Sequence, residues 1–188
     1  MPGTPARTGN SEKILLGYGT FFIDDVAVGL TRGGGQFTLE RTIRHIGADG
    51  DHGSYKDRHV IDESKPKLKM NLLELMGDNL EKIYPAISRT ETTDNTHYNS
   101  NGEVDPITTN TVKGEWSIDS NDYHTVKWVG KTKDGKSVII KLFNAINLDN
   151  PDWALADKDE VVGSVTFEGT YPEDCEEGYE PWEVTWVA

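Results

Sequence analysis

The sequence predicts a mostly β protein, an antiparallel β-sandwich or barrel with one short flanking α-helix. Three observations support this. Several segments alternate apolar and polar residues with a period of two, which is typical of strands that bury one face. An Asp134-Gly135 pair separates two such segments, and Asp-Gly is a strong tight-turn signal. The apolar content of 35% is low for a compact globule and fits sheets with one wet face.

The clearest strands enclose a long polar loop. In residues 36–46, Phe37, Leu39 and Ile43 fall on one face, together with Arg41 and His45. We expect the end of this face to meet solvent or another subunit, because two of its members are polar. A second strand is expected over residues 67–75. The intervening loop, about residues 47–65, is too long for a tight hairpin.

The remaining elements follow from local signals. Short strands are expected at 17–24 and 26–31, and the glycines at 33–35 break the pattern as a turn or bulge. Apolar spacing of three and four predicts one helix over 78–84, with Asp78 as its cap and Pro85 ending it. Residues 88–111 are polar and rich in threonine and asparagine, and are interpreted as a loop, with an irregular strand as the alternative. Further strands are expected at 112–118, 123–131, 136–146, 161–171 and 182–187, with one helical turn at 153–155.

The chain is expected to form one domain over residues 15–188, preceded by a flexible arm over residues 1–14. The start of the sequence lacks the apolar core of a secretory signal, and no apolar run reaches membrane-spanning length. The single cysteine, Cys175, cannot form an internal disulfide. We therefore expect a protein that folds in a cytoplasm and does not enter a membrane.

No motif predicts a cofactor, a metal or a catalytic centre. The glycines at 33–35 precede a strand and lack the lysine of a phosphate-binding loop. Asp49, Asp51 and Asp57 lie near His52 and His59, but their spacing fails the calcium-loop pattern, so a solvated or interface loop is favoured over a metal site.

Two other functions stay open. Trp116, Trp128, Trp182 and Trp186 lie on predicted strands, where core packing is the default. If they were exposed on one sheet face, they could form a sugar-stacking platform, which makes a carbohydrate-binding β-sandwich of phage or bacterial origin the first alternative. An acidic glycosidase is the second alternative, because acids are abundant, although no motif pairs two carboxylates.

Charge is unevenly distributed along the chain. The net charge is −13, which argues against nucleic-acid binding by phosphate neutralisation. Residues 149–188 contain twelve acids and one lysine, whereas basic residues gather between Arg32 and Lys69. Opposite patches on one molecule favour head-to-tail association, although a solvated acidic surface that aids solubility explains the same pattern.

Residues 28–75 resemble the major tail tube proteins of long, non-contractile-tailed bacteriophages, in the branch common among phages and prophages of Gram-positive bacteria. The similarity covers about a third of the chain. It is carried by Val28-Gly29-Leu30-Thr31-Arg32-Gly33-Gly34, Phe37-Thr38-Leu39-Glu40, Arg44, Ile46, Asp49-Gly50, Gly53, Lys56, Pro66-Lys67-Leu68 and Leu73-Glu74-Leu75.

The resemblance implies a structural, non-enzymatic virion protein that is assembled in the host cytoplasm. Its copies would form hexameric rings that stack into a tube for DNA passage, in contact with tape measure, tail tip and tail terminator proteins. The long loop would reach a neighbouring copy, and the N-terminal arm and acidic C-terminal segment would be candidates for ring-to-ring contacts. The loop residues expected at the interface are Asp49, Gly50, Asp51, Gly53, Tyr55, Lys56, Asp57 and Arg58.

Overall fold

The regular secondary structure of the chain is almost entirely antiparallel β-strand, as the fold-class prediction states. The computed structural model describes residues 9, 11–75, 79–176 and 178–187. Its strands are β1 (Leu15–Ile23), β2 (Val26–Ala27), β3 (Thr31–His45), β4 (His59–Leu72), β5 (Ile87–Asp94), β6 (Ile107–Gly114), β7 (His124–Thr132), β8 (Ser137–Asn147), β9 (Gly163–Gly169) and β10 (Trp182–Trp186). The helical elements are α1 (Asn79–Ile83) and the 3₁₀ turns η1 (Ser11–Lys13) and η2 (Ser120–Asp122).

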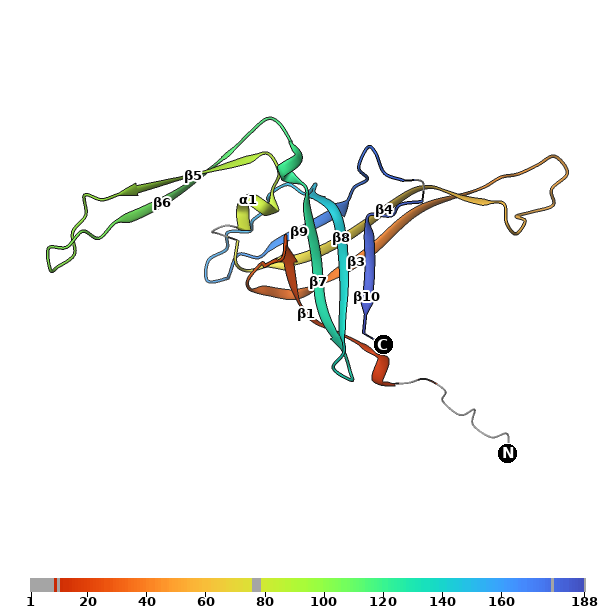
Figure 1. Cartoon of the computed structure of the whole chain (residues 1–188), viewed down its shortest axis with the longest axis horizontal. Coiled ribbons are helices and arrows are strands. Elements are labelled where there is room, and N and C mark those ends of the chain that lie inside the picture. The colour runs from red at the N-terminus through yellow and green to blue at the C-terminus, as the bar shows by residue number, and fades with distance from the viewer. Residues whose placement is uncertain (1–8, 10, 76–78, 177, 188) are drawn as a thin grey trace.

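Eight strands form one sheet that divides at β8. The order is β2-β1-β7-β8-β9-β4-β3, and β10 also pairs with β8. Because β7 occupies one edge of β8, β10 and β9 share the other edge, β10 along residues 138–142 and β9 along residues 145–147. Figure 1 shows that β9, β4 and β3 consequently cross the strands β1, β7 and β8 as a second layer.

The core lies between these two layers. One layer contributes Phe21, Ile23, Val126 and Leu142, and the other contributes Leu68, Met70, Leu72, Val165 and Phe167. Ile83 and Tyr84, at the end of α1, join the same cluster. The helix therefore covers part of the core beside the sheet, as predicted from its apolar spacing.

Glycines are required at two places in the fold, at a bulge in β3 and beside the buried ring of Trp128. Gly33 and Gly34 have φ of 83° and 72°, and the β3–β4 register shifts between Thr31 and Gly35. The predicted glycine break is therefore a bulge inside β3. Gly19 and Gly130 lie against the indole of Trp128, and a Cβ at either position would overlap that ring.

Two sequence predictions about loops were wrong. The loop predicted at 47–65 is shorter, because β4 begins at His59 and pairs with β3 from His45 onward. Residues 88–111, predicted as a loop with an irregular strand as the alternative, instead contain most of the regular paired strands β5 and β6. In both cases the strand segment is exposed on both faces and mostly polar. Its residues therefore do not alternate between apolar and polar, which is the pattern that predicts a strand.

Other boundaries shift by smaller amounts. The hairpin predicted around Asp134-Gly135 is confirmed as β7 and β8, with Gly135 at φ 84°. The strand expected at 112–118 ends at Gly114, and the helical turn expected at 153–155 is irregular chain. Asp78, the predicted helix cap, lies outside the described residues, as do most of residues 1–14.

Candidate self-assembly surfaces

The β3–β4 hairpin leaves the body of the protein as a long arm (Figure 1). Near the body its inner face is half-buried at Phe37 and contributes buried Leu68 to the core. Further out, the face predicted from the alternation of residues 36–46 continues with Ile43, which pairs directly with Ile61. Ile43 is 59% exposed and Ile61 is 52% exposed. The core face of the sheet thus extends beyond the core and presents an uncovered isoleucine pair.

The tip of the arm, residues 46–58, holds all eight residues predicted at the interface. Arg58 forms an ion pair with Asp51 at 2.9 Å, and its guanidinium lies 5.1 Å from the centre of the Tyr55 ring. The Tyr55 N–H donates to Nε2 of His45 at 3.1 Å. Asp51, Tyr55 and Arg58 are therefore brought together, and the tip has a defined shape before any partner binds.

The other five predicted residues extend around this cluster. Gly50 and Asp57 have φ of 89° and 66° and shape the turns of the tip. Asp49, Gly53 and Lys56 are exposed, and no side-chain partner is found for Asp49 or Lys56 among the described residues. Their position at the far end of the arm makes them available for contact, although no contact with a second chain tests the prediction.

The root of the arm is fastened by one carboxylate, that of Glu180, which precedes β10. It accepts hydrogen bonds from Arg41 Nη2 at 2.9 Å and Ser64 Oγ at 2.9 Å, one from each strand of the arm. Tyr171 Oη at 3.3 Å and Trp182 Nε1 at 3.1 Å donate to it as well. The connection between β9 and β10 is thereby tied to the place where the arm leaves the body.

The environment of Glu180 favours its charged form. Burial acts to raise the pKa of this carboxyl, but the hydrogen bonds from Ser64 and Trp182 and the charge of Arg41 outweigh burial and lower it. Burial raises the pKa of the neighbouring Tyr171 hydroxyl, so this group stays protonated and can donate. The cluster is therefore an ionic lock at neutral pH.

An open sheet edge lies beside the lock. β9 pairs with β4 only from Lys67 to Leu72, so residues 59–66 of β4 have β3 on one side and no strand on the other in the described chain. A groove of about 670 Å³ follows this edge, lined on the far side by residues 168–171 and 178–180. Unpaired strand edges recruit further strands unless they are covered.

The β5–β6 hairpin is a second arm, in a segment where the sequence allowed an irregular strand but did not predict a regular hairpin. It points away from the β3–β4 arm in Figure 1, and its two strands pair only with each other. Most of its residues are exposed on both faces, and threonines face each other in the pairs Thr90–Thr111, Thr92–Thr109 and Thr93–Thr108. The high threonine content was the one available signal of strand. A two-stranded hairpin without cover is marginally stable in water.

The basic half of the sequence does not form a free positive patch. Arg32 pairs with Glu160, Arg41 with Glu180, and Lys67 with Glu40 and Glu168. Arg44, Arg58 and Lys65 also have acidic partners nearby. Three of the twelve acids of segment 149–188 are among these partners, so part of the predicted charge separation is neutralised within the molecule.

The tryptophan platform on which the carbohydrate-binding alternative depends is not formed. Trp128 is buried, and Trp182 packs at 5.6 Å from the ring of Phe37. Trp116 is fully exposed but follows β6 outside any strand, close to the start of β7, whereas exposed Trp186 pairs with Val138 at the opposite end of β8. The two exposed indoles therefore lie at opposite ends of the sheet and cannot stack on one sugar.

Few other features point to chemistry. Among the described residues, no cluster of three histidine, cysteine or acidic side chains is arranged to hold a metal ion. The same part of the chain contains no helix with the length and apolar character needed to cross a membrane. The exposed apolar face, the open edge and the arms are what remain as candidate functional surfaces.

Comparisons with known proteins return distant structural matches. No family model matches the sequence, and no curated protein matches it. One similar solved structure is the tube-terminating cap of an anti-feeding prophage, with 11% identity, complete coverage of both chains and a TM-score of 0.47. Another comes from the extended sheath–tube complex of an extracellular contractile injection system, with 8% identity, coverage of 93% of this chain and 92% of the other, and a TM-score of 0.45. At these values neither match establishes a fold or a function for this chain.

Proposed function

We propose that this chain is a structural subunit of a bacteriophage tail tube, whose copies join into hexameric rings that stack around a channel for DNA. The observation that carries the proposal is the exposed Ile43–Ile61 pair on a preformed arm, where the core face continues without cover. Burying such a pair against another copy is favourable by about 25 cal/mol per Å² of apolar surface.

Three further features support association between copies. The edge of β4 at residues 59–63 has no strand beside it in the described chain, and a neighbouring strand would satisfy its backbone groups, whereas Ser64 is covered by Tyr171. The β5–β6 arm extends in another direction and needs cover of its own. Two unlike arms on one chain fit heterologous contacts, which close into rings when the rotation permits.

The net charge fits a channel through which DNA moves without binding. Six copies with a charge of −13 would carry about −78 per ring. Acids that face the bore would repel phosphates, whereas a DNA-binding wall needs clustered lysine and arginine. Tape measure, tail tip and terminator proteins are the partners expected at the ends of such a tube.

The test replaces the exposed pair with serine. The I43S/I61S variant should remain folded, because these side chains are outside the core, but should fail to form rings or tubes in negative-stain electron microscopy. The matched control is T42S/E63Q, the adjacent cross-strand pair on the opposite face. Tubes formed equally by both variants, or a wild-type protein that stays monomeric at high concentration and with its tail partners, would contradict the proposal.

A further inference from the structure

The end of the sheet at the β7–β8 turn carries an excess of lysine and contains a groove. Lys13, Lys131, Lys133 and Lys136 are all exposed there, against two acids, Glu12 and Asp134. Backbone hydrogen bonds from Lys133 to Ile14 and from Asp134 to Glu12 hold η1 beside the turn. Lys136 lies 3.9 Å from Asp134, but the four lysines still outnumber the two acids at this end, which is notable in a chain of net charge −13.

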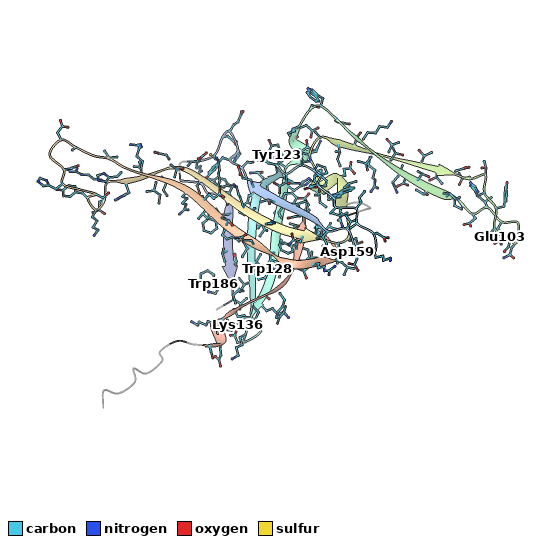
Figure 2. The ribbon with its side chains drawn as sticks, turned by 180° about the vertical axis from the view of Figure 1, so that it is seen from behind. Glu103, Tyr123, Trp128, Lys136, Asp159 and Trp186 are labelled. Carbon is cyan, nitrogen blue, oxygen red and sulfur yellow. The ribbon has the colours of Figure 1, made fainter. Side chains whose placement is uncertain are left out.

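The groove at this end combines an apolar floor with a charged rim. It encloses about 410 Å³ and is lined by the apolar residues Leu15, Val138, Trp186 and Val187, and by Thr132, two lysines (Lys13 and Lys136) and one acid, Asp134. Trp186 is 66% exposed, so its indole is an uncovered apolar surface of the described chain. Figure 2 shows Lys136 and Trp186 close together at this end, opposite Tyr123. The groove suits an occupant that is both apolar and acidic.

The opposite end of the same sheet supplies such a segment. The connection between β9 and β10 carries Glu173, Asp174 and Glu176, all exposed, and no ion pair is found for them among the described residues. Tyr171 and Pro172 precede these acids, and Tyr171 is partly exposed. This connection returns to β8 where the Phe143 N–H donates to the Pro181 carbonyl, five residues from Val138, or about 17 Å along the strand.

We propose that the acidic connection of one copy, residues 172–176, docks into the basic groove of a second copy, and that this contact stacks the copies end to end. The charges are complementary, and the apolar floor can receive Pro172, whereas Tyr171 remains hydrogen-bonded to Ser64 and Glu180 in its own chain. The two surfaces lie at opposite ends of one molecule, so the contact is heterologous and repeats along an axis instead of closing into a symmetric dimer. The inference rests on the proposed function and identifies one of its contacts.

Charge reversal tests the pairing. The loop variant E173K/D174K/E176K and the groove variant K13E/K133E/K136E should each raise the protein concentration needed for tube formation by about tenfold or more. An equimolar mixture of the two variants should restore tubes, because the reversed loop of one variant fits the reversed groove of the other, and the native loop of the second fits the native groove of the first, so the two alternate along the axis. The six-fold variant, with both ends reversed in one chain, should restore tubes.

The native Cys175 provides a second, direct test. It is exposed within the acidic connection, so a cysteine introduced at Lys136 should form a disulfide with Cys175 of the next copy under mild oxidation. K136C should give a ladder of oligomers on a non-reducing gel, whereas K136C/C175S and the wild type should give at most dimers.

The outcomes separate this contact from the proposed function. Tubes that form normally in both reversal variants, together with no K136C ladder, would overturn the docking contact and leave the tail-tube proposal standing. A groove filled by the chain's own N-terminal residues would give the same negative results, and deletion of residues 1–10 would then expose Trp186 to fluorescence quenching. A wild-type protein that never assembles would instead refute the tail-tube proposal itself.

Discussion

Replacing Glu180 with alanine tests whether one carboxylate fastens the arm to the body. Two of its four hydrogen bonds are short, at 2.9 Å from Arg41 and from Ser64, and Ser64 is only 6% exposed. After truncation the buried Ser64 hydroxyl loses its acceptor, which costs about 1–3 kcal/mol, and the half-buried Arg41 loses its partner. The Glu180 side chain is 29% exposed, so water compensates part of the loss. We expect the free energy of unfolding to fall by about 2–4 kcal/mol.

The assay is urea unfolding of the monomer at neutral pH, followed by tryptophan fluorescence, since Trp182 donates to this carboxylate and reports on the site. The matched control is E183A on β10, where Glu183 is exposed and lies 3.8 Å from Lys141. This control should change stability by less than about 1 kcal/mol. If E180A lowered the free energy of unfolding by less than about 1 kcal/mol, or by no more than E183A, the lock would be refuted, because removing the acceptor of a buried donor must cost more than this.

Two more predictions concern stability. Because the pKa of Glu180 is lowered in the folded state, its stabilisation is present above the ordinary carboxyl pKa and is lost as pH falls through the folded value. The stability difference between wild type and E180Q should therefore be full above about pH 5 and shrink below it, and a difference independent of pH would be inconsistent with an ionised lock. G130A should lower stability by about 1–3 kcal/mol, because its Cβ would overlap the Trp128 ring, whereas G47A, with open space around it, is the control; equal effects would contradict the packing argument.

The elements that could be predicted from the sequence are those that bury one face in the core and expose the other. Phe37 and Leu39 alternate with polar residues because β3 packs one side on the core, and Asp134-Gly135 specifies its turn locally. The β5–β6 hairpin could not be found in this way. Both of its faces meet solvent, so the period-two signal that marks a half-buried strand is absent.

The candidate surfaces were predictable only in part. The tip was predicted as an interface loop from resemblance, and the structure shows Asp51, Tyr55 and Arg58 in contact, but no second chain tests the interface itself. The lock joins Arg41 to Glu180, which are 139 residues apart in the sequence. No pattern of neighbouring residues predicts a contact over this separation. The basic groove needs η1, the β7–β8 turn and the end of β10 brought together, which only the three-dimensional fold supplies.

One connection, residues 170–181, belongs to both proposed contacts, and this has a mechanical consequence. Its acidic part would enter the groove of the next copy along the axis, while Glu180 near its end holds Arg41 and Ser64 at the root of the lateral arm. A contact that orders this connection therefore also favours the lock, and a lock that holds the arm limits how freely the acidic part can move. If one contact has already ordered this connection, the second contact does not have to order it again. Lateral association and axial association therefore favour each other. E180A should accordingly weaken K136C–Cys175 crosslinking even though Glu180 lies outside the groove, whereas E183A should leave the crosslinked ladder unchanged.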